Sequence, residues 1–372
     1  MDCPCCDLGT GRARFAKGDL VPDTQRSTPA VQAWVESPLQ LLSVIEAHAA
    51  GLLGPRTTIV PRADVVALAL TTAHVQPLGL PVGLDIAAPS MTDGAGSGAR
   101  GTWVVGDVFS GRVQRSLILR RPDRVVVVDD GRATLHLLAC LTGSSGTPFL
   151  RARAVRAGAA SRSLPGAPRR ILGALAGARL RDAAAEGRLT IVTACPVEPA
   201  LEAQAARVGV TLVRHRFGWL RATPCPGAPE QRTVVLGSAM VRDALLRQRP
   251  YLDWVSERAA REPLAYFPHR REDSTTLAHL RRQPGVEVYE PGVPVELSLR
   301  GLSSRQRVFS LPSTAALTLR SVLADRGTQV VVDPVPNTWW TDSTSAAVRA
   351  HLGAGGEPAI AGTTAATGSL VA

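Results

Sequence analysis

Short runs of β-branched residues alternate along this chain with stretches in which alanine and leucine recur at helical spacing. Strands are predicted at 31–35, 56–60, 65–70, 102–105, 124–128, 189–193 and 211–213, then from 233 and at 263–267, 286–289, 306–310 and 329–332. Helical patterns lie between them, as at 39–47 and 171–185. Strands that alternate with helices pair in parallel, and the helices cover the faces of the sheet. The sequence therefore predicts an α/β protein with parallel sheets.

The length of the chain favours two such domains. Its 372 residues exceed one ordinary hydrophobic core,. A proline-rich stretch at 223–229 separates the two sets of strands. We expect a Rossmann-like domain at 31–222, a linker at 223–232 and a second Rossmann-like domain at 233–350. Residues 1–30 and 351–372 lack a periodic pattern and are predicted to be disordered tails,.

The positive charge of the chain does not indicate a nucleic-acid partner. The formal net charge is +11, but Lys17 is the only lysine and the arginines are scattered among Ala, Gly and Val. Aromatic residues make up 4% and do not interleave with the basic runs, whereas single-strand binding needs such stacking platforms,. We therefore expect no nucleic-acid partner.

The cysteines and the hydropathy indicate a cytoplasmic protein. Three of the six cysteines crowd the first six residues and the others are dispersed, so their spacing suggests no disulfide framework,. No apolar run approaches the roughly 20 residues of a spanning helix. The Arg-rich segment 151–188 leaves peripheral contact with the inner face of the membrane open, although it lacks Trp or Phe anchors,.

An acidic pair followed by glycine, Asp129-Asp130-Gly131, ends the predicted strand 124–128. Adjacent carboxylates oppose each other's ionisation, so one of them can have a raised pKa and accept a proton from an attacking hydroxyl. Gly131 would allow a substrate to approach closely. The alternative is an ordinary Asp-Gly turn.

Two further motifs suit the binding of a phosphate group. His269 follows a predicted strand and precedes Arg270 and Arg271, so it could protonate a leaving phosphate while the arginines neutralise its charge,. Ser313 and Thr314 stand where a helix is predicted to begin, and hydroxyls and free amides at a helix N-terminus bind phosphate,. The alternatives are a basic surface turn and simple helix capping.

In this order, the three motifs resemble those of bacterial sialyltransferases of the lipooligosaccharide sialyltransferase and polysialyltransferase type. That group carries an acidic-acidic-Gly motif, a His-Pro motif and a Ser-Ser/Thr motif. The resemblance extends from about Trp34 to Val332. Other matching pieces are Ser37-Pro38-Leu39-Gln40, Gly106-Asp107, Ser110-Gly111, Gly237-Ser238 and Pro294-Val295-Glu296.

The resemblance implies a GT-B glycosyltransferase with two Rossmann-like domains that face a central cleft. It would transfer sialic acid, or a related nonulosonic acid, from a CMP-sugar donor to a hydroxyl of a glycan acceptor with inversion, and it would need no metal and no cofactor. The N-terminal domain would lie on the acceptor side and the C-terminal domain would bind CMP.

The same resemblance implies roles for individual residues. Asp129, with Asp130 beside it, would act as the general base, and His269 would protonate the leaving phosphate. The residues implied on the donor side are Gly237, Ser238, Arg270, Arg271, Glu296, Ser313 and Thr314. The residues implied in the substrate cleft are Ser37, Gln40, Asp107, Ser110 and Gly131.

One departure from the family pattern keeps other functions open. His269 is followed by Arg270 where the family has proline, and Pro268 precedes the histidine instead. The alternatives are a GT-B transferase that uses another nucleotide sugar, and a catalytically inactive GT-B-like protein of polysaccharide assembly or binding.

Overall fold

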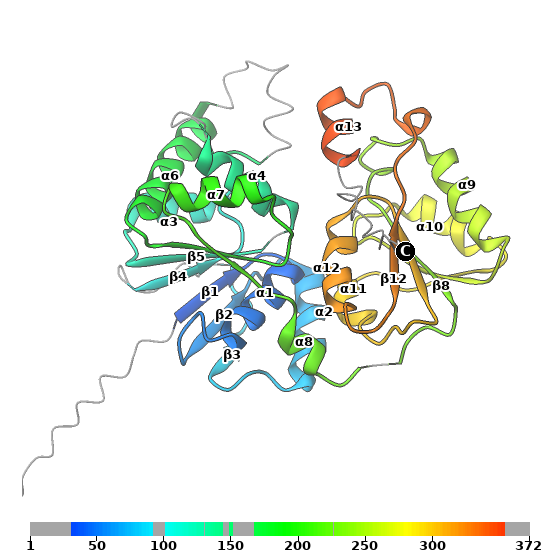
Figure 1. Cartoon of the computed structure of the whole chain (residues 1–372), viewed down its shortest axis with the longest axis horizontal. Helices are drawn as coiled ribbons and strands as arrows, with labels where there is room; N and C mark the ends of the chain where they lie inside the picture. Colours follow the sequence, from blue (N-terminus) through cyan, green and yellow to red (C-terminus); the bar gives the residue numbers. More distant parts are fainter. Residues whose placement is uncertain are drawn as a thin grey trace, which may run out of the picture.

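Two α/β domains lie side by side in the computed structural model (Figure 1). The structure describes residues 31–91, 101–129, 131–143, 149–151, 167–225 and 227–353. The expected tails fall outside these residues, except for 351–353, which end the last helix.

A seven-stranded parallel sheet forms the N-terminal domain, in the order β3-β2-β1-β4-β5-β6-β7. Its strands are β1 (Val31–Val35), β2 (Thr57–Pro61), β3 (Leu84–Ile86), β4 (Thr102–Val105), β5 (Arg124–Val128), β6 (Leu189–Thr193) and β7 (Thr211–Arg214). Its helices are α1 (Pro38–Ala49), α2 (Val66–Val75), η1 (Gln76–Leu78), α3 (Gly111–Leu119), α4 (Arg132–Thr142), α6 (Ala167–Ala185), α7 (Pro199–Arg207) and α8 (Gly218–Ala222).

The C-terminal domain repeats the layout on a five-stranded parallel sheet, in the order β10-β9-β8-β11-β12. Its strands are β8 (Thr233–Leu236), β9 (Leu264–Phe267), β10 (Val286–Val288), β11 (Arg307–Ser310) and β12 (Gln329–Val332). Its helices are α9 (Gln248–Ala259), α10 (Ser274–Arg281), α11 (Val295–Ser298), α12 (Thr314–Val322), η3 (Asn337–Trp339) and α13 (Ala346–Gly353). The predicted fold class, two Rossmann-like α/β domains, is confirmed.

Alternate residues of each central strand enter different hydrophobic clusters. Val126 and Val128 of β5 belong to the cluster beneath α1, whereas Val125 and Val127 belong to the cluster beneath α3, α4 and α6. A parallel strand that is buried on both faces needs such an unbroken apolar run. This requirement explains why the run of valines identifies β5 in the sequence.

The segment 65–70 is a helix, and its prediction as a strand is wrong. It begins α2, whose buried residues are Leu68, Thr71 and Val75, while Val66 is 76% exposed. Burial at intervals of three and four residues is helical, and a short apolar run does not reveal this period by itself. The actual edge strand, β3, has three residues and was not predicted.

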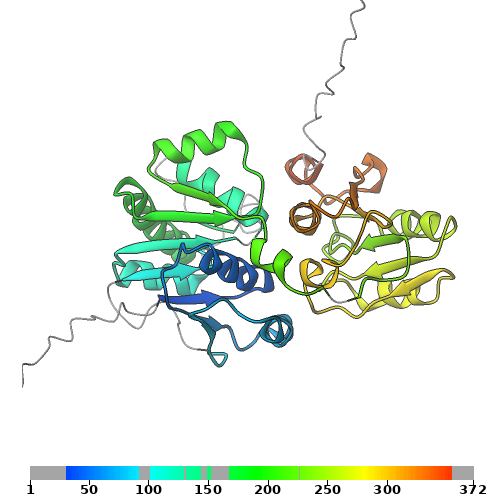
Figure 2. The ribbon, with the colours of Figure 1, turned by 60° about the horizontal axis from the view of Figure 1, so that its bottom comes forward.

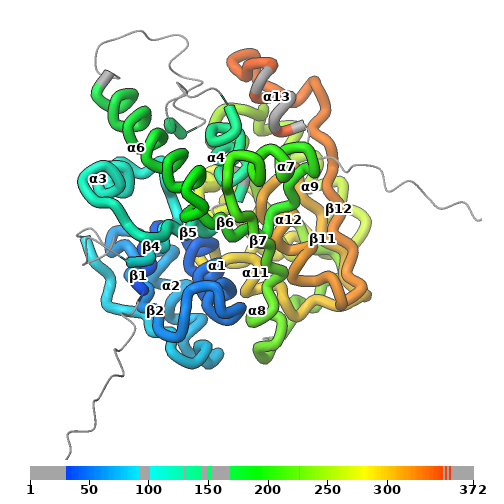
Figure 3. The backbone as a smooth tube through the Cα atoms, turned by 60° about the vertical axis from the view of Figure 1, so that its left-hand side comes forward, coloured from blue at the N-terminus to red at the C-terminus, as the bar shows by residue number. Residues whose placement is uncertain are grey.

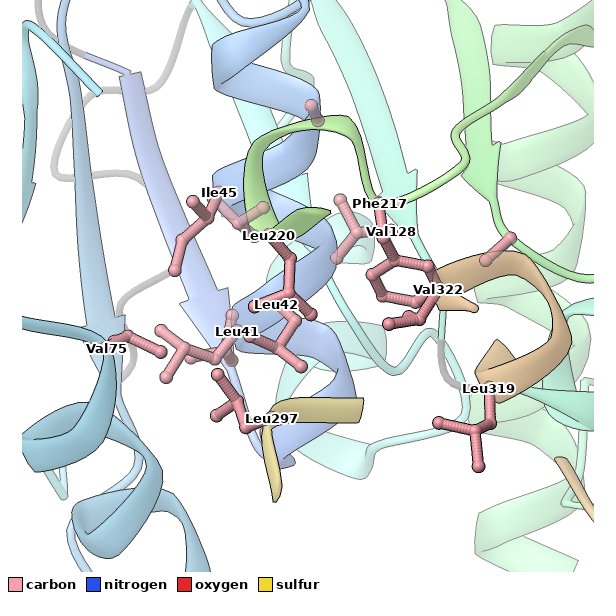
Figure 4. Packing of buried hydrophobic residues seen from close by; sticks show 14 of the residues in the cluster. Leu41, Leu42, Ile45, Val75, Val128, Phe217, Leu220, Leu297, Leu319 and Val322 are labelled. Atoms are coloured by element: carbon pink, nitrogen blue, oxygen red, sulfur yellow. The ribbon is translucent and has the colours of Figure 1, made fainter. Parts of the chain in front are cut away.

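The two domains share one hydrophobic cluster. It joins α1 and α8 of the N-terminal domain to α11 and α12 of the C-terminal domain. Figures 1 and 3 both place α8 and α11 close together, and Figure 2 shows α8 between the two sheets. Figure 4 shows the seam at close range, with Leu297 near Leu41 and Val322 near Phe217. Buried apolar side chains therefore hold the domains against each other.

Polar groups reinforce this seam at its margin. The Arg221 guanidinium at the end of α8 forms an ion pair with Asp325, which follows α12.

Among the described residues, no helix has the length and apolar character needed to cross a bilayer.

Candidate functional site

The acidic turn begins directly after β5, in the middle of the N-terminal sheet. Asp129 is 0% exposed and accepts four hydrogen bonds. Its Oδ1 accepts from Gly131 N at 2.8 Å and Thr134 Oγ1 at 2.7 Å. Its Oδ2 accepts from Thr193 Oγ1 at 3.0 Å and Ala194 N at 2.9 Å. Asp129 therefore ties the end of β5 to the end of β6. Asp130 lies outside the described residues.

Gly131 brings the acidic turn against the C-terminal domain. Its backbone has φ 73° and ψ −133°, a conformation open mainly to glycine,. A Cβ at this position would lie 2.4 Å from Thr314 Cγ2 and 2.7 Å from Thr314 Oγ1. The acidic motif and the Ser-Thr motif, 183 residues apart in the sequence, thus meet at the seam between the domains.

The Ser-Thr turn forms the N-terminus of α12. Ser313 caps the helix by accepting from Ala316 N at 3.2 Å, and its hydroxyl lies 3.2 Å from Ser310 Oγ. Ser313 therefore acts as the N-cap of α12, as one of the two interpretations predicted. Phosphate binding by the same turn stays a prediction.

Glu296 on α11 is buried behind this turn. Its Oε1 accepts a hydrogen bond from Thr318 Oγ1 on α12. Burial raises the pKa of Glu296, and the negative charge of Asp129 raises it further. Glu296 therefore lies within electrostatic reach of Asp129 across the seam, and its carboxyl group is bonded inside the protein.

The His269 turn follows β9 at the carboxyl edge of the C-terminal sheet. His269 Nδ1 accepts from Arg271 N at 3.1 Å, and His269 N donates to Glu272 Oε2 at 3.1 Å. A Cβ at Gly237, which follows β8, would lie 2.7 Å from His269 N and 2.3 Å from Glu272 Oε2. Gly237 therefore lets the His269 turn pack directly against the end of β8.

The two arginines beside His269 have different surroundings. Arg271 donates to both carboxylate oxygens of Asp243, at 3.3 and 2.8 Å. Arg270 is exposed. The Arg271 guanidinium is already engaged in a bidentate pair with Asp243,. The exposed Arg270 is therefore the more available of the two to an anion.

Two tyrosines lie beneath the His269 turn. Tyr251 OH lies 2.5 Å from Tyr266 OH and accepts from Ser238 N at 3.2 Å. Tyr266 OH donates to Glu272 Oε1 at 2.5 Å. Burial is the larger influence and raises the pKa of Glu272 to about 7, although the hydrogen bonds from Tyr266 and His269 act to lower it. Tyr251, Tyr266 and Glu272 thus form one buried hydrogen-bonded network. It bonds the backbone of Ser238 and of His269, and Gly237 packs against it.

Glu272→Gln is expected to change how stability depends on pH. Because the folded-state pKa of about 7 exceeds the ordinary value of 4.5, the folded protein binds the additional proton between these values, and its stability falls as pH rises through this range,. The glutamine variant lacks this loss, so its unfolding free energy relative to wild type should rise by up to about 3 kcal/mol between pH 5 and 8 in urea titrations. The exposed control Glu290→Gln should show no such trend, and an equal trend in both variants would refute the assignment.

The predicted substrate-cleft residues of the N-terminal domain gather where β1 and β4 end. These neighbouring strands lead to opposite sides of the sheet order, which is the switch point where ligands bind in open α/β sheets,. Ser37 caps α1, and Gln40 Oε1 accepts from Glu36 N at 2.7 Å. Ser110 Oγ donates to Glu36 Oε1 at 2.8 Å.

Asp107 lies in the same group and is paired with Arg151. Burial raises the pKa of Asp107, while the Arg151 charge lowers it.

Glu36, which bonds Gln40 and Ser110 in this group, was not predicted from the sequence as a site residue. Its place at the end of a predicted strand, directly before Ser37, was the available signal.

His215 was also missed, although it follows the strand predicted at 211–213. The ring is 7% exposed, and both of its nitrogens lack a hydrogen-bond partner among the described residues. Burial lowers the pKa of His215 to about 4, and the charge of Asp129 opposes that shift. The strand-end position that singled out His269 applies equally to His215.

Two cavities lie away from these turns. One of about 330 Å³ is lined by Trp254, Arg258 and Trp339 among others, and one of about 550 Å³ lies between α4, α6 and α7. Neither is lined by the motif residues. Among the described residues, no three His, Cys, Asp or Glu side chains are grouped as metal ligands.

Comparison with known proteins shows a likeness in structure and none in sequence family. No protein-family model and no curated protein matches the sequence. A similar solved structure is that of UDP-glucose:anthocyanidin 3-O-glucosyltransferase in complex with UDP, with a TM-score of 0.39 and 10% identity over 82% of this chain and 80% of that chain. A likeness at this level transfers no residue role.

Proposed function

We propose that this chain is a glycosyltransferase of GT-B architecture that takes a sugar from a nucleotide donor at the seam between its domains. The observation that carries the proposal is the contact of Gly131 with Thr314. It brings a buried carboxylate motif from one parallel sheet against a helix N-terminus from the other. A carboxylate suits the activation of a hydroxyl, and a helix N-terminus suits the departing phosphate.

The finer proposal is inverting transfer of sialic acid, or a related nonulosonic acid, from a CMP-linked donor to a glycan hydroxyl. Its support is the resemblance of the motif order to bacterial sialyltransferases. In this proposal the Asp129 charge assists removal of the acceptor proton, and Ser313 and Thr314 hold the CMP phosphate. His269, on its turn beside Gly237, donates to the leaving group. Positioning and phosphate stabilisation would contribute most of the rate.

Two measurements test this proposal. Because a ligand that binds only the folded state raises Tm, CMP should raise Tm more than UDP or GDP. Incubation with CMP-sialic acid and mixed glycan acceptors should release CMP. A larger shift with UDP or GDP would assign another nucleotide sugar, and CMP binding without release or transfer would indicate an inactive binding protein.

The double variant Ser313→Ala/Thr314→Ala is expected to weaken CMP binding by about 1–3 kcal/mol, the scale of hydrogen bonds lost to a charged group. Calorimetry would record this as a roughly 5- to 150-fold rise in Kd. Thr275→Ala, an exposed threonine on α10 of the same domain, is the control and should leave Kd unchanged. If the double variant loses folding stability and keeps its CMP affinity, these residues only cap α12.

A further inference from the structure

His215 holds a fixed position beside the acidic turn. It follows β7 directly, and its backbone N donates to Thr193 O at 3.0 Å. Thr193 in turn donates its hydroxyl to Asp129 Oδ2. Because β5, β6 and β7 are neighbours in the sheet, the imidazole lies at the same carboxyl edge as Asp129.

The unpaired state of this imidazole is unusual for a buried ring. A neutral imidazole carries one N–H donor and one acceptor, and buried polar groups are normally hydrogen-bonded. His48, which is 6% exposed, follows that rule: its Nδ1 lies 3.0 Å from Thr57 Oγ1 and its Nε2 lies 2.9 Å from Val82 O. His215 is as buried, but among the described residues its ring nitrogens have no hydrogen-bond partner. Its ring packs edge-on against Phe217, with 4.8 Å between the ring centroids. Two ring nitrogens without hydrogen-bond partners are suited to bond a ligand,.

The packing around His215 extends to the other domain. Phe217, against which the ring packs, is 0% exposed and lies beside Val322 of α12 in the seam (Figure 4). A ligand held between the domains could therefore supply hydrogen-bond partners to the ring. Because the ring is buried, an acceptor can reach it only after the packing around it, which includes Phe217, has moved.

His215 and Asp129 are suited to different roles because their hydrogen bonds differ. All four hydrogen bonds to Asp129 come from the protein, so its carboxylate is occupied. Neither ring nitrogen of His215 has a hydrogen-bond partner among the described residues, and burial lowers the pKa of the ring to about 4, so the ring is neutral near pH 7 and one nitrogen carries a free lone pair,. The negative charge of Asp129 favours the imidazolium once it has formed.

We propose that His215 is the catalytic residue that takes the proton from the acceptor hydroxyl, with Asp129 stabilising the charge behind it; this inference rests on the proposed glycosyl transfer. The O–H bond of the acceptor breaks and an N–H bond forms on the imidazole. The oxygen uses its electron pair to bond the anomeric carbon of the donor. The bond from that carbon to the phosphate oxygen breaks, and its electron pair leaves on the nucleotide. The imidazolium then returns its proton to water.

The test compares His215→Gln with His48→Gln, a substitution at an equally buried histidine whose ring bonds Thr57 and Val82 of the N-terminal domain. Nucleotide release is measured with CMP-, UDP- and GDP-sugars and mixed glycan acceptors, alongside nucleotide affinity by calorimetry. His215→Gln should lower kcat at least about 100-fold, the scale of general base catalysis, and leave nucleotide Kd within about threefold. His48→Gln should lower Tm and leave kcat unchanged. Imidazole added to His215→Ala should restore part of the lost turnover, because it can occupy the space that the ring has left.

Three results would overturn the assignment in distinguishable ways. Turnover within about threefold of wild type in His215→Gln removes His215 from the reaction and leaves the proposed function standing. If kcat, Tm and nucleotide affinity all fall in His215→Gln and imidazole restores no turnover, the ring has a structural role. A wild-type protein that releases nucleotide from none of the three donor classes overturns the proposed function, and the role of His215 falls with it.

Discussion

Asp129→Asn is expected to lower turnover at least about 100-fold and to destabilise the N-terminal domain by about 1–3 kcal/mol. Both effects follow from the four donors around the carboxylate. An amide has one acceptor oxygen, so its NH₂ group must face either Gly131 N or Ala194 N, and a backbone donor cannot rotate away as a hydroxyl can,. One buried N–H is then left unpaired. The lost negative charge also no longer stabilises a cation beside the turn.

Stability and turnover separate in a comparison with Thr134→Val. That variant removes one neutral donor from Oδ1 and keeps the carboxylate, so it should lower the unfolding free energy by about 1 kcal/mol and leave kcat within a few-fold,. Urea titration and CMP release measure the two quantities. If Asp129→Asn folds and keeps its turnover while Asp130→Asn abolishes it, the catalytic carboxylate is Asp130. If both aspartate variants unfold, the motif is a structural turn.

Gly131→Ala is expected to cost at least about 2 kcal/mol of folding stability and to loosen the contact between the domains. The φ/ψ combination alone costs an alanine about 1–3 kcal/mol. The new Cβ would also overlap Thr314 Cγ2 at 2.4 Å, which ordinary van der Waals contact does not allow. Urea titration gives the stability, and small-angle scattering gives the separation of the domains.

A double-mutant cycle isolates the contact across the seam. In a Thr314→Ala background the overlap with Cγ2 and Oγ1 is gone, so Gly131→Ala should cost at least about 1 kcal/mol less,. Gly51 is also at positive φ, but a Cβ there would meet no atom within 4 Å. Gly51→Ala therefore tests a positive φ without a new contact and should show no coupling to Thr314. Equal costs of Gly131→Ala in both backgrounds would refute the contact between the two motifs.

The sequence was sufficient to locate most strands, because buried parallel strands need continuous β-branched runs. β4, β5 and β6 have the predicted bounds. The segment 65–70 shows where this signal fails: its six residues are apolar in either structure, and only the contacts of Leu68 and Val75 show that it is a helix. The edge strand β3 is too short to produce a run.

The candidate site was predictable in its positions and not in its contacts. Residues at strand ends reach the carboxyl edge of a parallel sheet whatever the tertiary detail, so Asp129 and Ser313 could be placed. The bonds from Thr193 and Ala194 to Asp129 span 64 and 65 residues, and no local pattern encodes them. For the same reason, the pairing of Arg271 with Asp243 and the unpaired ring of His215 became visible only in the fold.

The apolar seam between the domains lowers the observed affinity of any ligand that must enter there. Closed packing of Leu41, Leu297 and Val322 is the resting state, so only the fraction of molecules that has opened can admit a donor. The observed affinity of such a donor equals its intrinsic affinity multiplied by that fraction. The affinity for any donor then depends on the fraction of molecules in which the seam is open as well as on the groups that line it. A side chain packed in the seam can therefore change that affinity without touching the substrate.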